Sequence, residues 1–60
     1  MVLYSALSVG TQVTYNGVNG TVTNTRRLNR NAIEVEYVDG KRECYIGKNM
    51  DSVLATMTLQ

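Results

Sequence analysis

The chain of 60 residues contains no histidine, tryptophan, phenylalanine or proline, and Cys44 is its only cysteine. A single cysteine excludes an intrachain disulfide, and without histidine it leaves one chain too few ligands for a zinc site. An unpaired cysteine is typical of a reducing compartment, where it usually serves as a small apolar residue. We therefore expect no metal and no other cofactor, and we predict that Cys44 packs in the interior.

Long hydrophobic runs and strong net charge are also missing. No apolar run approaches the roughly 18 residues that are needed to cross a bilayer. Residues 1–7 lack the cationic start and the long apolar stretch of a signal peptide. The net charge of +1 is too small to indicate nucleic acid on its own. These features predict one domain over residues 1–60, soluble, cytoplasmic and without membrane contact, for which self-association is an open means of stabilisation.

What the chain does contain are β-branched segments separated by strong turn signals. Two Asn-Gly pairs lie within residues 16–20, and both residue types tolerate the positive φ of tight hairpin turns. A two-residue turn at 16–17 would pair Val13 with Gly20, whereas a four-residue loop would pair Val13 with Val22. We favour the four-residue loop, because it places apolar side chains opposite each other.

A second hairpin is predicted around Asp39-Gly40. Ile33, Val35 and Tyr37 alternate with glutamates, which is typical of a half-buried strand. A two-residue turn would pair Val35 with Cys44 and Ile33 with Ile46, so that one face is almost wholly apolar. A three-residue turn would place apolar residues opposite charged ones. We favour the two-residue turn, which directs Tyr45 to the outer face.

The remainder is predicted as a turn at 47–52, with at most one 3₁₀ turn, followed by a last strand in which Val53, Ala55, Met57 and Leu59 share a face. No helix of useful length is expected. The predicted strands are therefore 7–15, 20–26, 32–38, 41–46 and 53–59. Five short antiparallel strands usually close into a small barrel, because closure removes exposed edges. The predicted interior consists of Val13, Val22, Ile33, Val35, Cys44 and Ile46, and residues 1–7 form an extra strand or an N-terminal arm.

The segment containing Val9-Gly10, Val13, Gly17 and Gly20-Thr21-Val22 resembles the start of SH3-like small barrels of the KOW and Tudor type. In those families a glycine precedes the first strand, and a second glycine ends the first turn before a valine. A one-turn 3₁₀ element usually precedes the last strand, and Asn49 to Ser52 fits it. The resemblance covers residues 7–24 and implies an all-β, five-stranded antiparallel SH3-like barrel. The tryptophan and acidic loop of signalling SH3 domains are missing, which argues against proline-peptide binding.

Catalytic constellations are absent from the sequence. Ser5, Ser8 and Ser52 have no histidine to act as their base, and neither does Cys44. Glu36 and Glu43 face each other in the favoured register, but nearby cations neutralise such pairs far more often than the pair performs acid–base chemistry. We predict no catalytic residues and a function other than catalysis.

The densest group of candidate binding residues lies in the loop 24–31. Guanidinium and amide groups suit phosphate oxygens and base edges, and the resemblance implies the same, because KOW-like barrels commonly contact RNA through such loops. The simpler alternative is a solvated polar loop. A cation patch that extends to the next strands and an exposed tyrosine that stacks a base would complete the site. The predicted nucleic-acid-binding residues are Arg26, Arg27, Asn29, Arg30, Lys41, Arg42, Tyr45 and Lys48.

Two further interpretations follow from the tyrosines and the chain ends. A Tudor-like cage for methylated side chains needs several converging rings, and only four tyrosines are present, so we disfavour it. The uncharged segment 52–60 and the apolar segment 1–7 favour strand addition to a partner or to a second copy. The alternative function is thus a protein-interaction module, such as an adaptor or phage-type inhibitor of a larger complex, that docks through a terminal strand or the same loop.

Overall fold

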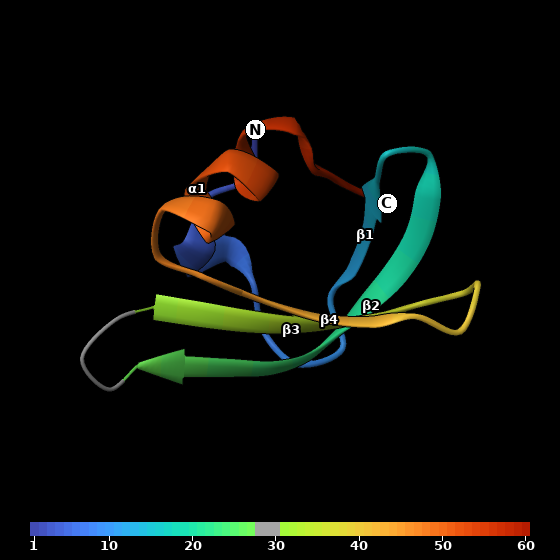
Figure 1. Cartoon of the computed structure of the whole chain (residues 1–60), viewed down its shortest axis with the longest axis horizontal. Coiled ribbons are helices and arrows are strands. Elements are labelled where there is room, and N and C mark those ends of the chain that lie inside the picture. The colour runs from blue at the N-terminus through green and yellow to red at the C-terminus, as the bar shows by residue number, and fades with distance from the viewer. Residues whose placement is uncertain (28–30) are drawn as a thin grey trace.

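The computed structural model describes residues 1–27 and 31–60, with the backbone alone for residues 26 and 27. Within these residues, five antiparallel strands form one sheet in the order β4-β3-β2-β1-β5, and one α-helix packs on it (Figure 1). The elements are a 3₁₀ turn η1 (Tyr4–Ala6), β1 (Gln12–Tyr15), β2 (Val18–Arg27), β3 (Asn31–Tyr37), β4 (Arg42–Ile46), α1 (Gly47–Thr56) and β5 (Thr58–Leu59).

The predicted β-rich class is confirmed, but the barrel is not closed. β4 and β5 are the two edges of the described sheet. The long strand β2 has a register shift between Val22 and Asn24, and an irregularity of this kind bends a strand and increases its twist. The sheet therefore curls without meeting itself (Figure 1). The last strand pairs with the first, as the barrel prediction required, through Val13 opposite Leu59 and Thr14 opposite Thr58.

The first hairpin uses the two-residue turn, so the predicted four-residue loop is wrong. Asn16 and Gly17 have φ of 52° and 77°, as a type I′ turn requires, and Val13 pairs with Gly20. The missing side chain of Gly20 is compensated from the neighbouring strand. A Cβ on Gly20 would lie 2.8 Å from both Tyr37 Cδ1 and Val35 Cγ1. Gly20 is thus packed by side chains of the neighbouring strand β3, and not by an apolar side chain opposite it in the hairpin.

The second hairpin contains a three-residue loop, Val38 to Gly40, in place of the predicted two-residue turn. The Tyr37 N–H donates to the Lys41 carbonyl at 2.7 Å, and the Gly40 N–H donates to the Tyr37 carbonyl at 3.0 Å. Gly40 has a φ of 93°, which favours glycine. The loop shifts β4 by one residue relative to the prediction, so that every side chain of the strand changes face.

This shift corrects the predicted interior. Val13, Val22, Ile33 and Val35 are fully buried as expected, but Cys44 is exposed and Ile46 is 43% exposed. Tyr45, which was predicted to lie on the outer face, is opposite Ile33 and buried. A tyrosine ring removes far more apolar surface from water than a cysteine does, which favours the observed register.

The segment after β4 is a helix, which corrects the predicted turn and long last strand. Met50, Val53, Leu54 and Met57 follow the spacing i, i+3, i+4, i+7 and are all buried. Burying each such side chain stabilises the fold by about 1.5–3 kcal/mol. An exposed edge strand would leave part of this apolar surface in water, so the helix is favoured. Only Thr58 and Leu59 remain extended, which leaves a mostly β domain with one helix instead of an all-β one.

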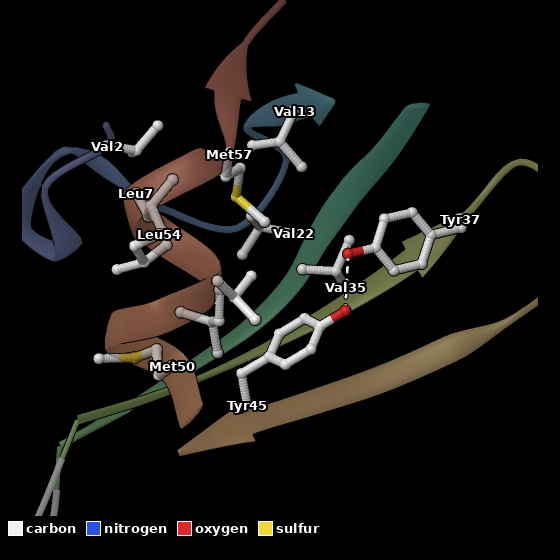
Figure 2. Packing of buried hydrophobic residues seen from close by; sticks show 12 residues of the cluster. Val2, Leu7, Val13, Val22, Val35, Tyr37, Tyr45, Met50, Leu54 and Met57 are labelled. Atoms are coloured by element: carbon white, nitrogen blue, oxygen red, sulfur yellow. Dashed lines mark hydrogen bonds between the residues drawn. The ribbon is translucent and has the colours of Figure 1, made fainter. Parts of the chain in front are cut away.

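Residues 1–7 form an arm that packs on α1, and not an extra strand. The Val2 N–H donates to the Leu54 carbonyl at 2.9 Å, and the side chains of Val2 and Leu7 are buried. Figure 2 shows both side chains beside Leu54 and Met57, so that arm, helix and sheet share one core.

Gly20→Ala tests the close packing at the first hairpin. The added Cβ requires Tyr37 and Val35 to move, so we expect the free energy of unfolding to fall by about 1–3 kcal/mol in urea denaturation. Ser52→Ala, an exposed helix position, is the control and is expected to change it by less than about 0.5 kcal/mol. Equal stabilities for the two variants would contradict the packing at Gly20.

Candidate functional site

The predicted loop 24–31 is shorter than expected, because β2 extends to Arg27 and β3 begins at Asn31. The Arg-rich connection, residues 26–30, begins at the end of the sheet where these two strands meet. The backbone of Arg26 pairs with Ala32 and that of Arg27 with Asn31, so the last β2 residues are held beside the first residues of β3. Asn29, Arg30 and the side chains of Arg26 and Arg27 lie outside the described residues. The structure therefore describes only the strand ends on either side of residues 28–30, at Arg27 and Asn31.

The other predicted cations do not form one patch with this connection. Lys48 follows two residues after Ile46, which pairs with Ala32, so Lys48 lies at the same end of the sheet. Lys41 and Arg42 lie at the opposite end, beside the β3–β4 loop (Figure 1). The predicted continuous cation surface is thus divided between two ends.

Three of the five acidic residues, Glu36, Asp39 and Glu43, lie at the β3–β4 end, while Glu34 lies in the middle of β3 and Asp51 lies on α1. Glu36 lies opposite Arg42, and not opposite Glu43 as predicted, and its Oε2 is 3.3 Å from Arg42 Nη2. Both side chains are more than half exposed, so this ion pair contributes little to stability. Asp39 lies in the loop and accepts the Lys41 backbone N–H at 3.0 Å. Glu36, Asp39 and Glu43 therefore all lie far from the Arg-rich connection.

Tyr45 does not provide the predicted outward stacking surface. Its hydroxyl is 2.8 Å from the hydroxyl of Tyr37, and both side chains are buried (Figure 2). The ring of Tyr15 meets that of Tyr45 edge to face, with centroids 6.2 Å apart and planes at 67°. Tyr15, Tyr37 and Tyr45 thus converge on the inner face of the sheet.

These tyrosines line a pocket of about 250 Å³ between the two hairpin turns. The pocket was not predicted from the sequence, because the wrong register turned Tyr45 outward. The alternation of the sequence did contain this information, because with a three-residue loop residues 37, 43 and 45 share the inner face with Tyr15. The complete lining is Tyr15, Asn16, Val18, Tyr37, Asp39, Lys41, Glu43 and Tyr45.

The hydroxyl pair stays neutral at physiological pH. Burial raises the pKa of Tyr37 well above its usual value, and the hydrogen bond to Tyr45 and the charge of Glu43 raise it further. Burial also raises the pKa of Tyr45, against the opposing effect of the Tyr37 hydrogen bond. The pocket therefore combines uncharged phenol rings with carboxylates at its rim, and Glu43 has no ion pair within the described chain.

Comparisons with known proteins add no functional assignment. No family model, no curated protein and no solved structure matches this chain. In the described ranges no helix is long and apolar enough to cross a membrane. Nor do the cysteine and acidic side chains of the described residues gather in groups of three or more that could hold a metal ion.

The tyrosine pair makes stability sensitive to alkaline pH. Unfolded tyrosine ionises near pH 10, whereas the folded pKa values of Tyr37 and Tyr45 are higher. Their contribution is fully present below about pH 10 and is lost as the pH rises toward the folded pKa values. Urea denaturation between pH 8 and 11 is expected to show this decline, and Tyr37→Phe/Tyr45→Phe to reduce it. An unchanged decline in the double variant would exclude these tyrosines as its cause.

Proposed function

We propose that this chain is a non-catalytic nucleic-acid-binding module, without a cofactor, that engages phosphates through the connection between β2 and β3. The carrying observation is the separation of charge along the sheet. The backbone of Arg26 and Arg27 lies at one end with Lys48 and with Asp51 of α1, whereas Glu36, Asp39 and Glu43 outnumber Lys41 and Arg42 at the other end. A polyanion is therefore favoured at the first end over the second.

The helix adds to the field at the cationic end. α1 begins there, its first turn contains Lys48 and no acidic residue, and no side chain caps its first N–H groups. A helix N-terminus carries partial positive charge, which favours a nearby phosphate. The proposed contacts are Arg26, Arg27 and Arg30 to phosphates, Asn29 to base edges, and Lys48 at the flank. Lys41, Arg42 and Tyr45 are left out of this interface.

The SH3-like type and the cytoplasmic location belong to the same proposal. A four-strand meander whose fifth strand returns to β1 supports the SH3-like type. The ten-residue helix α1, in place of a single 3₁₀ turn, departs from that pattern. The lone exposed thiol supports a reducing compartment.

A protein-interaction module is the second candidate, and the open sheet edges favour it. β4 and β5 each have one described neighbour, so each presents backbone groups on its outer side. At β5 the Gln60 N–H donates to the Gln12 carbonyl at 3.0 Å. Because antiparallel ladders alternate, the Leu59 N–H points away from β1 and is available to an added strand. A second copy would pair through the same edge.

Replacing Arg26, Arg27 and Arg30 together with alanine tests the proposed function. The wild type is expected to bind a fluorescein-labelled single-stranded oligonucleotide, and log affinity should fall linearly with log salt, with a slope of about 0.7 for each phosphate engaged. The triple variant is expected not to bind it. Lys41→Ala/Arg42→Ala is the control and is expected to bind as the wild type does. Retained binding by the triple variant, or a loss confined to the control, would refute the proposal.

Leu59→Pro separates the two candidate functions. It removes the outward N–H while leaving the β1–β5 hydrogen bonds in place, and Leu59→Ala removes the side chain alone. If nucleic acid is the target, both variants retain the oligonucleotide with wild-type affinity. A partner protein captured from lysate with weak salt dependence, and absent with the proline variant but not with the alanine variant, would establish strand addition instead.

A further inference from the structure

We propose that the pocket between the two hairpin turns binds the guanidinium group of an arginine side chain presented by a partner peptide. The site is defined by Tyr15, Tyr37 and Tyr45 on its inner walls and by Asp39 and Glu43 at its rim. It lies at the end of the sheet opposite the Arg-rich connection and is independent of the proposed nucleic-acid interface.

The walls are fixed in position. Tyr37 and Tyr45 are tied by their 2.8 Å hydroxyl contact, and Tyr15 stands at 67° to Tyr45. The β3–β4 loop is tied to β2, close to the first hairpin turn, by the Val38 N–H, which donates to the Asn19 carbonyl at 2.9 Å. A ligand therefore meets preformed aromatic surfaces and orders few groups on binding.

The negative charge and the hydrogen-bond acceptors of the residues that line the pocket favour a cationic ligand. The rim contains two carboxylates against one ammonium, that of Lys41, and the phenol faces attract positive charge. Glu43 is exposed and makes no ion pair with any described residue. It lines the pocket together with Tyr37 and Tyr45, and its charge adds to the rise in the pKa of both hydroxyl groups.

The same acceptors favour guanidinium over other cations and over bases. A guanidinium is planar, stacks on aromatic rings, loses hydration readily and donates in a fork that matches a carboxylate. A trimethylated ammonium has no donor for Glu43, and a lysine ammonium is more strongly hydrated. A nucleotide would bring its phosphate toward Asp39 and Glu43. The volume of about 250 Å³ suits one side-chain head group.

The test is a ¹H–¹⁵N NMR titration with the end-blocked peptide Gly-Gly-Arg-Gly-Gly. Matched peptides contain lysine, trimethyl-lysine or the neutral isostere citrulline in place of arginine. We expect saturable shifts centred on Asn16, Lys41, Glu43 and Tyr45, severalfold weaker binding of the lysine peptide, and none of the citrulline peptide. Absence of saturable shifts, equal binding of citrulline, or tighter binding of trimethyl-lysine would overturn the proposal.

Two charge-removing variants locate the site. Glu43→Gln is expected to weaken the arginine peptide about tenfold, while Glu36→Gln, on the other face of the sheet, leaves it unchanged. Both positions are exposed, and the spectra show whether each variant is folded. Equal effects of the two variants would overturn the assignment. The variant in which Arg26, Arg27 and Arg30 are replaced by alanine is expected to bind the peptide as the wild type does. The two proposals, for the pocket and for the nucleic-acid interface, are therefore tested independently.

Discussion

The three-residue loop from Val38 to Gly40 is the constraint on which the rest of the structure depends. Its hydrogen bonds, from Gly40 to Tyr37 and from Tyr37 to Lys41, set the register of β4 against β3. A loop one residue shorter would turn every β4 side chain to the other face. The buried hydroxyl pair, the tyrosine pocket and the exposure of Cys44 all follow from this register.

The inner face of the sheet is filled in two ways along its length. Near the β2–β3 connection, α1 and the N-terminal arm cover it with aliphatic and methionine side chains (Figures 1 and 2). Near the hairpin turns, beyond the helix, tyrosines fill the space with their hydroxyl groups paired. The side chains of the aliphatic part are buried, whereas the aromatic part leaves a pocket with polar groups at its mouth. The same sheet thus provides both a core and a recognition surface.

The distribution of charged residues also differs between the aliphatic and the aromatic part of the sheet. Glu36, Asp39 and Glu43 outnumber Lys41 and Arg42 at the pocket end, whereas Lys48 and the backbone of Arg26 and Arg27 lie at the other, so a chain of net charge +1 has two ends of different charge. Both proposed binding sites depend on that polarity, with an anion at the Arg-rich connection and a cation in the pocket. Neither would be expected from the net charge alone.

Sequence reasoning located the three middle strands well, but it began the first strand too early at residue 7, took most of the helix for the last strand, and predicted the wrong hairpin registers. Alternation located β3 and β4 to within a residue, and the Asn-Gly pairs located the first hairpin. Pairing apolar with apolar then gave the wrong register twice, because Gly20 gains its packing from Tyr37, and because Tyr45 gains more by burial than Cys44 does. The helix was missed because Val53, Ala55, Met57 and Leu59 fit a strand period, although Met50, Val53, Leu54 and Met57 fit a helical one. The pocket could not be found without the correct β4 register.

The reactivity of Cys44 tests that register most directly, since the chain has a single thiol. With the three-residue loop, Cys44 lies on the outer face and is exposed. We predict that the folded protein reacts with a disulfide reagent such as Ellman's reagent at a rate within about tenfold of the urea-unfolded chain. Protection of the thiol by several orders of magnitude in the folded protein would place Cys44 in the interior and contradict the register on which the pocket depends.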